Sequence, residues 1–261
     1  MKKILGGIAI TALLAAPAMA ADIPARMPVK APAPAAVMAY NWSGLYTAST
    51  LGWGRWEING AYVNTGLPDQ HNTDGSRAWY GSIIGFQHQW NNLVLGAEAS
   101  YNSPWDRDYT SSLSVSGDCL GSSAVANRTC ESRIRNYWTA GGKLGLAFNN
   151  VMIYGTGGYA NGKIQTQTTV TTTGVLTSST SDRHGGWYAG AGVDMYVTKF
   201  WLSDLIIGVE YQHVDLGRSL HVDTLPGATG VNNRNMDATI DIIRAKATFK
   251  YSLGGPVVAR Y

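Results

Sequence analysis

The sequence predicts an all-β fold, an eight-stranded antiparallel transmembrane β-barrel. Three observations predict it. Eight runs of residues alternate between apolar side chains and polar or small ones, as residues of a strand do when they point to opposite faces of a sheet. Each run exceeds the roughly 9–11 residues that a tilted strand needs to cross a bilayer. No separate helical or sheet layer follows that could cover the apolar faces, so these faces are expected to contact lipid.

The composition agrees with this fold and excludes others. The chain has 31 Gly, 14 Tyr and 9 Trp but only 4 Phe, and 14% of its 261 residues are charged. Many Tyr and Trp residues are typical of barrels whose aromatic side chains lie at membrane interfaces. A mean hydropathy of −0.09 argues against a bundle of transmembrane helices. The net charge of +3 is too small and too dispersed to predict nucleic-acid binding.

Residues 1–20 form a predicted signal peptide. Two lysines precede a short apolar run, and Ala18-Met19-Ala20 provides small residues at the positions that signal peptidase requires, so cleavage is expected between Ala20 and Ala21. The apolar run is too short for a spanning helix. The alternative is a retained membrane anchor.

Three segments follow the predicted signal peptide. Residues 21–40 are rich in Ala and Pro and are expected to form an extended periplasmic linker. The barrel is expected over 41–251. Residues 252–261 form either a C-terminal tail or the terminal assembly signal, because either Tyr251 or Tyr261 could be the aromatic residue that ends the last strand.

The eight runs follow one another along the chain. They are residues 44–58, 77–90, 93–102, 133–148, 151–163, 183–197, 205–216 and 238–251. The fourth and fifth meet at Asn149-Asn150, a two-residue connection typical of a β-hairpin. The apolar residues expected to face outward include Leu45, Leu51, Trp53, Tyr80, Ile84, Phe86, Leu93, Leu95, Tyr101, Ile134, Trp138, Leu144, Leu146, Phe148, Trp187, Val193, Met195, Leu205, Ile207, Val209, Ile243, Phe249 and Tyr251.

The connections between the runs alternate in length. Short ones fall at 91–92, 149–150 and 198–204, whereas 59–76, 103–132, 164–182 and 217–237 are long and polar. Outer-membrane barrels have short periplasmic turns and long external loops. Both ends of the barrel are therefore expected in the periplasm.

The opposite face of the strands carries charged residues that are expected to point into the lumen. They are Glu98, Arg133, Arg135, Lys143, Asp194, Glu210, Arg244, Lys246 and Lys250. Eight strands enclose a space that side chains fill, and a buried charge needs a partner. We expect a salt-bridged plug that sets the three carboxylates against Arg135, Lys143 and Arg244. The alternative is a wider, water-filled lumen.

Aromatic residues gather near the ends of the runs and are expected to form interfacial girdles. They are Tyr40, Trp42, Trp53, Trp56, Trp79, Trp90, Trp105, Trp187, Trp201 and Tyr251. The alternative for some of them is packing within the loops.

Two kinds of residue in the external loops suggest further chemistry. Cys119 and Cys130 could form a disulfide in an exported protein, or else a free redox pair. His71, His184 and His221 lie in or beside loops and could coordinate haem iron, although solvated loop histidines are the alternative. No spacing of ligands predicts a metal site, and no triad or other catalytic arrangement is present, so we expect no enzymatic activity.

Several stretches resemble the small outer-membrane β-barrels of alphaproteobacteria, a group of porin-family surface antigens and haemin-binding proteins. They are residues 40–46 (YNWSGLY), 93–98 (LVLGAE), 142–148 (GKLGLAF), 153–160 (IYGTGGYA), 186–193 (GWYAGAGV) and 208–217 (GVEYQHVDLG). The resemblance implies a location in the cell outer membrane, surface exposure and a barrel without catalysis. Haem binding is a property of only some members.

These observations predict an outer-membrane barrel with a structural or surface-exposed role. The alternatives are a small-solute porin and the capture of haemin or another ligand by the external loops. The expected partners are outer-membrane lipid and lipopolysaccharide, the barrel-assembly machinery, and small solutes or haemin under those alternatives.

Overall fold

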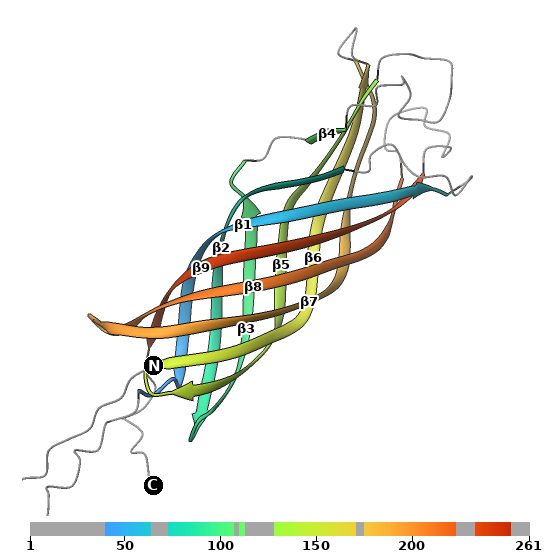
Figure 1. Ribbon diagram of the computed structural model, residues 1–261. Coiled ribbons are helices and arrows are strands. Elements are labelled where there is room, and N and C mark those ends of the chain that lie inside the picture. The colour runs from blue at the N-terminus through green and yellow to red at the C-terminus, as the bar shows by residue number, and fades with distance from the viewer. Residues whose placement is uncertain are drawn as a thin grey trace, which may run out of the picture. The chain divides into compact units, whose positions relative to one another are not determined.

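The computed structural model describes residues 40–63, 73–106, 110–112, 128–170, 175–222 and 233–251 (Figure 1). All of them belong to the second of two compact units, residues 37–261. The described residues contain no helix long and apolar enough to cross a membrane. The predicted signal peptide, the linker up to residue 39, the C-terminal segment 252–261, Cys119 and His71 lie outside the described residues.

The described chain is an antiparallel sheet that closes on itself. Its strands are β1 Gly44–Tyr62, β2 Thr73–Trp90, β3 Leu93–Pro104, β4 Thr110–Ser112, β5 Arg128–Phe148, β6 Val151–Val170, β7 Leu176–Phe200, β8 Ser203–His221 and β9 Arg234–Tyr251. The order is β3-β2-β1-β9-β8-β7-β6-β5-β4, and β3 also pairs with β5. The short β4 pairs only with β5, so the ring contains eight strands and the predicted fold class is confirmed.

Two-residue turns join the strands at one end of the barrel, which we call the turn end. Asn91, Asn149 and Trp201 open these turns with φ values of 52°, 54° and 56°. Asn tolerates positive φ and is favoured in such hairpins. The turn at Trp201-Leu202 is shorter than the predicted connection 198–204, because β7 continues to Phe200 and β8 begins at Ser203.

At the other end, the loop end, the strands run farther than predicted. The strand β6 continues to Val170 and β7 begins at Leu176, although residues 164–182 were expected to form a loop. This region is rich in Thr, Ser and Gln rather than in apolar residues. Thr is β-branched and favours strands, so the ladder persists where the apolar alternation that guided the prediction has ended.

The outer wall exposes aliphatic side chains that a water-soluble protein would bury. Examples that are each more than half exposed are Leu51, Ile84, Leu144, Ile153, Val209 and Ile243. Contiguous apolar exposure on this scale is typical of a surface that contacts lipid.

The predicted aromatic girdles are correct for only part of the set. Trp53, Trp90, Trp105, Trp187, Trp201 and Tyr251 are exposed, but Trp42, Trp56 and Trp79 are at most 2% exposed and lie inside the barrel. The prediction was wrong for these three. Trp53 and Trp56 are three residues apart in β1, so they must point to opposite faces of the sheet.

Candidate functional site

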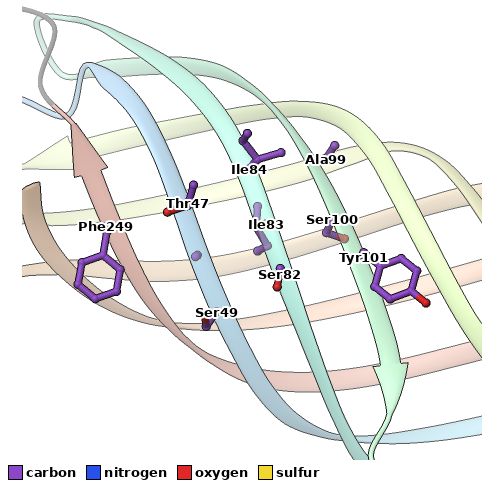
Figure 2. Close-up of a pocket in the computed structure, with 10 residues that line it drawn as sticks. Thr47, Ser49, Ser82, Ile83, Ile84, Ala99, Ser100, Tyr101 and Phe249 are labelled. Atoms are coloured by element: carbon purple, nitrogen blue, oxygen red, sulfur yellow. The ribbon is translucent and has the colours of Figure 1, made fainter.

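The barrel lumen gathers the charged residues of the strands and is the candidate functional site. A hollow of about 480 Å³ also lies on the outer wall, where Ser49, Ile84, Ala99 and other residues of β1, β2, β3 and β9 line it (Figure 2). None of its lining residues is charged. It faces the lipid side of the wall, whereas the lumen contains a built polar network.

The lumen is filled in three layers that follow one another along each strand. The inward residues of β9 show the order, because Ile240 and Ile242 lie toward the loop end, Arg244 and Lys246 in the middle, and Lys250 at the turn end. We call these the loop-side layer, the ionic layer and the turn-side layer.

The ionic layer contains three carboxylates and three cations, each at most 7% exposed. They are Glu98 on β3, Lys143 on β5, Asp194 on β7, Glu210 on β8, and Arg244 and Lys246 on β9. The formal charges balance within the layer. Each of these residues occupies a position that alternates with the lipid-facing positions of its strand, so its side chain points into the lumen.

Cross-strand register sets the centre of the ionic layer. Glu210 lies directly opposite Arg244, and Gly208 lies between Asp194 and Lys246. Glycine at position 208 leaves the space free, since a Cβ there would lie 2.0 Å from Asp194 Oδ1 and 2.8 Å from the Val193 carbonyl oxygen and would displace the carboxylate. The sheet therefore leaves room for the carboxylate to reach across to the lysine.

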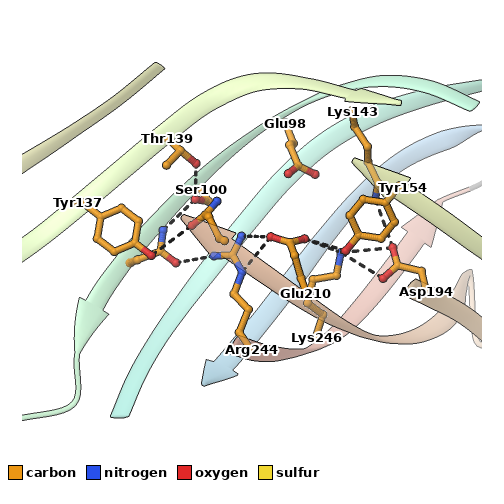
Figure 3. Close-up of polar contacts among 12 residues, drawn as sticks. Glu98, Ser100, Tyr137, Thr139, Lys143, Tyr154, Asp194, Glu210, Arg244 and Lys246 are labelled. Carbon is orange, nitrogen blue, oxygen red and sulfur yellow. Dashed lines mark hydrogen bonds and ion pairs between the residues drawn. The ribbon is translucent and has the colours of Figure 1, made fainter. Parts of the chain in front are cut away.

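Ion pairs join these residues into one network (Figure 3). Arg244 Nε and Nη2 donate to Glu210 Oε1 at 3.1 and 2.5 Å. Lys246 Nζ lies 3.3 Å from Glu210 Oε2 and 3.1 Å from Asp194 Oδ1. Lys143 Nζ reaches Asp194 Oδ2 at 3.2 Å. Every charged residue of the layer except Glu98 thus has an opposite charge in contact, which buried ions need.

Two tyrosines complete the network. Tyr154 Oη donates to Glu210 Oε2 at 2.7 Å, and Tyr46 Oη donates to Glu98 Oε2 at 2.8 Å. Lys143 Nζ lies 4.0 Å from the centroid of the Tyr154 ring, where a cation–π attraction is expected. Glu98 makes no ion pair with another described residue, so the tyrosine is its main partner.

Arg133 and Arg135 do not belong to this network, and their predicted inward positions were wrong. A β-bulge lies between Ile134 and Asn136, which leaves Arg135 unpaired in the ladder with β6. Arg135 is exposed, and the half-buried Arg133 donates to Gln165 Oε1 at 3.0 Å. Because the bulge adds one residue to β5, the positions that face inward and outward are exchanged on the loop side of the bulge. Ile134, expected to face outward, is consequently only 4% exposed.

The loop-side layer is apolar and was not predicted. Its buried members are Trp56, Ile58, Trp79, Ile134, Tyr137, Ala160, Ile164, Tyr188, Val214, Leu216, Met236, Ala238, Ile240 and Ile242. The sequence contained a pattern that could have revealed it. Ala238, Ile240 and Ile242 share the parity of the inward Arg244, so counting back from the charged residue places them in the lumen.

The turn-side layer is closed by the segment that precedes β1. Trp42 is fully buried, its backbone N–H donates to Gln89 Oε1 at 2.8 Å, and its carbonyl accepts from Gln87 Nε2 at 2.7 Å. Tyr40 stacks on Tyr196 with ring centroids 4.2 Å apart. The YNWS motif therefore packs into the turn end of the barrel rather than at its outer interface.

Lys250 was also expected among the interior charges, and it lies at this turn end. Its Nζ is 3.2 Å from Asp204 Oδ2, which accepts a further hydrogen bond from Tyr40 Oη at 2.8 Å. It also donates to the carbonyl of Asn41. Lys250 thus secures the segment before β1 instead of joining the ionic layer.

Comparison with known families decides what kind of barrel this is. Residues 7–242 match the family described as the outer membrane protein beta-barrel domain. The chain belongs to this family. The outer-membrane location and the family resemblance expected from the sequence are thereby confirmed, and in such a barrel the turn end faces the periplasm and the loop end faces the exterior.

Relatives and solved structures of outer-membrane barrels are similar to the chain. It is 28% identical over 223 residues to the 31 kDa outer-membrane immunogenic proteins of Brucella melitensis and Brucella suis, covering 82% of this chain and 87% of each relative. OprG of Pseudomonas aeruginosa has a TM-score of 0.43 at 12% identity, covering 82% of this chain and 99% of OprG. Ail of Yersinia pestis, crystallised with a heparin analogue, has a TM-score of 0.37 at 11% identity, with 79% and 99% coverage.

His184 and His221 lie in strands of the outer-membrane barrel, β7 and β8, and not in open loops. Both are fully buried, and their Nε2 atoms are 2.7 Å apart. His184 Nδ1 contacts the Gly217 carbonyl at 3.3 Å, and His221 Nδ1 contacts Thr180 Oγ1 at 2.8 Å. The two rings hydrogen-bond to each other, so this geometry does not present them to haem iron at the surface.

The remaining predicted residues are placed only in part. Cys130 lies in β5 opposite Thr168 of β6, whereas its predicted partner Cys119 lies outside the described residues, so the disulfide stays a prediction. Within the described strands, no group of three or more His, Cys, Asp or Glu side chains could hold a metal ion.

Proposed function

We propose that the chain is a sealed outer-membrane barrel whose role is to hold its external loops at the cell surface. The observation that carries this proposal is the loop-side layer, in which large apolar side chains such as Trp56, Trp79 and Ile164 fill the lumen next to the ionic layer. The role is structural and surface-exposed, and it requires no catalytic group.

The chemistry of the two layers argues against free diffusion of solutes. A hydrated ion would lose most of its water in the loop-side layer, where only a few polar groups, such as the hydroxyls of Tyr137 and Tyr188, stand among apolar side chains. In the ionic layer it would have to separate pairs such as Arg244–Glu210, which are buried and in contact. Eight strands leave an interior just wide enough for side chains. A small-solute porin is therefore the less favoured alternative.

Planar-bilayer recording of the refolded full-length protein tests the seal. We expect no stable conductance from the wild type. The double variant Trp56→Ala/Trp79→Ala should increase the frequency of brief conductance events, since it removes two indole rings from the lumen. Trp53→Ala is the matched control, because Trp53 lies on the same strand but is 62% exposed on the outer wall. A large stable conductance of the wild-type protein would show that the lumen is open.

Surface display is tested independently on intact cells. The Brucella relatives are named immunogenic proteins, which supports loops that antibodies can reach. Epitope tags inserted at 64–72 or 223–232 should bind antibody without permeabilisation. A tag at Asn149-Asn150, a periplasmic turn, should bind only after the outer membrane is opened. Equal labelling of both classes of tag in intact cells would exclude the proposed orientation.

Capture of haemin gains no support from the buried histidine pair. If loops elsewhere bind haemin, titration should give the same Soret change in wild type, His184→Ala and His221→Ala. Loss of the Soret change in either variant would show that the pair contributes after all.

A further inference from the structure

We propose that a row of three cations on the outer wall, Arg135, Lys163 and Arg183, binds the phosphorylated headgroup of a lipid in the outer leaflet of the outer membrane. We call these residues the cationic row. The inference uses the outer-membrane location but does not depend on whether the lumen is sealed.

The row crosses three neighbouring strands. Lys163 of β6 lies directly opposite Arg183 of β7 on one side and opposite Asn136 of β5 on the other. Arg135 is the unpaired bulge residue next to Asn136. Arg135 and Arg183 are exposed and Lys163 is half-buried, while the neighbouring Gly162 and His184 are buried on the inward face. All three cations therefore face outward, side by side.

Like charges in this arrangement destabilise a sheet unless something neutralises them. None of the three forms an ion pair with a described residue, and Arg183 donates only to the neutral amide oxygen Oδ1 of Asn161, at 3.2 Å. Two other outward arginines, Arg55 and Arg218, differ in this respect. Arg55 lies 3.5 Å from Asp74, and Arg218 lies 3.8 Å from Asp237. The uncompensated charge of the cationic row makes an external anion its natural partner.

The height of the row on the barrel points to a lipid headgroup. Trp138, Tyr159 and Trp187 are exposed on the same three strands, one on each, with the Trp138 and Tyr159 ring centroids 5.4 Å apart. Such aromatic residues mark the boundary between hydrocarbon and headgroups. Lys163 and Arg183 lie four residues farther toward the loop end, which is about 13 Å along a strand. They therefore reach the level at which lipid phosphates lie.

Local contacts orient one end of the row. Asn161 Nδ2 contacts Tyr159 Oη at 3.4 Å while its Oδ1 accepts from Arg183. The Tyr159 ring lies over Gly185, where a Cβ would come within 2.4 Å of the hydroxyl. Arg183 is thus linked through Asn161 to the aromatic boundary instead of extending freely into water. Guanidinium groups bind phosphate through paired hydrogen bonds, and an ammonium group between two of them adds charge.

The test measures lipid binding by the folded full-length protein in neutral detergent, with native mass spectrometry as the readout. The probes are lipid A carrying its phosphates and the same glycolipid after removal of the phosphates. We expect the phosphorylated form to bind at least about tenfold more tightly, since each cation near an anionic surface contributes measurably. The variant Arg135→Gln/Lys163→Gln/Arg183→Gln should lose this difference.

The matched control is Arg55→Gln/Arg218→Gln, which removes outward charges that already have carboxylate partners. It should bind phosphorylated lipid A within about twofold of the wild type. Heat-modifiable gel mobility reports folding of every variant. If the triple variant does not fold, Lys163→Gln alone, which removes the central charge, should weaken binding several-fold.

Three results would overturn the proposal. They are unchanged binding by the triple variant or by a folded Lys163→Gln protein, equal affinity for the two glycolipids, and complete competition by inorganic phosphate at equal concentration. The last result would mean that a soluble anion, and not a membrane lipid, is the partner. None of them bears on the sealed lumen, which the conductance measurement tests separately.

Discussion

The ionic layer and the loop-side layer fill adjacent lengths of the same lumen with opposite chemistry. In the ionic layer a few side chains are joined by individual ion pairs. Glu210, for example, contacts both Arg244 and Lys246. In the loop-side layer many side chains, most of them apolar, share their contacts, and directional bonds such as the one from Tyr137 Oη to Gln212 Oε1 are few. The difference teaches that one lumen can be filled in two ways. In the ionic layer a single substitution leaves a buried charge without its partner and is strongly destabilising. In the loop-side layer the loss of stability increases with the side-chain volume that is removed.

The largest effect is expected from Glu210→Gln in the ionic layer. The amide keeps the shape of the side chain but leaves Arg244 without its ion partner and Lys246 with only Asp194. We expect a loss of about 3–5 kcal/mol in the free energy of unfolding, measured by urea titration in lipid vesicles. Val209→Ala, on the lipid face of the same strand, serves as control. A loss below about 1 kcal/mol would remove the contrast between the layers.

The next effect is expected from Ile240→Ala in the loop-side layer. Removing a fully buried isoleucine side chain should cost about 2–4 kcal/mol by the same titration, because the site loses contacts and leaves a cavity. Ile243→Ala, three residues away on the outer wall and 61% exposed, should cost much less. If the two variants are equally stable, the apolar side chains on the inner wall do not form a packed layer.

A smaller, pH-dependent effect is expected where the histidine pair joins β7 and β8. The ladder between these strands ends at Trp187 and Asp215, so side chains hold their loop ends together. The two Nε2 atoms are 2.7 Å apart, so one ring must accept the hydrogen bond through an unprotonated nitrogen, and protonation of both rings removes this contact. The contact is therefore fully stable above about pH 6.5 and weakens as the pH falls below that value.

Hydrogen exchange measures this effect at the loop ends of β7 and β8. Once intrinsic rates are corrected for pH, exchange there should be faster at pH 5 than at pH 7.5, while the turn ends stay unchanged. In His184→Gln/His221→Gln, which has no imidazole at this contact, the acceleration should disappear. Exchange that is independent of pH in the wild type would contradict the argument.

The smallest effect on stability is expected from Arg135→Ala. Arg135 is exposed at the bulge, so the free energy of unfolding should change by no more than about 0.5 kcal/mol. Lys143→Ala removes a buried cation from the same strand and should cost several times more. Similar losses in both variants would restore Arg135 to the interior, as the alternation of the sequence first predicted.

The sequence predicted the features that depend only on neighbouring residues within one strand. The alternation of inward and outward positions along an uninterrupted strand identified six interior charges, which the structure brings together in the ionic layer. They are Glu98, Lys143, Asp194, Glu210, Arg244 and Lys246. The same rule gave the wrong positions for Arg133, Arg135 and Ile134, because a single bulge residue inverts every side chain beyond it. The buried positions of Trp42, Trp56 and Trp79 were missed since aromatic character alone does not indicate a face.

The sequence by itself determined the number of strands, the apolar outer wall, the charges of the ionic layer and the difference between turns and loops. These features depend on alternation and chain length, which are properties of neighbouring residues. Only the tertiary structure decided which charges pair, that the lumen is layered, that His184 meets His221, and that Arg135 joins Lys163 and Arg183 outside. Those features depend on the register and bulges fixed when strands distant in sequence close into a ring, and no local pattern specifies that register.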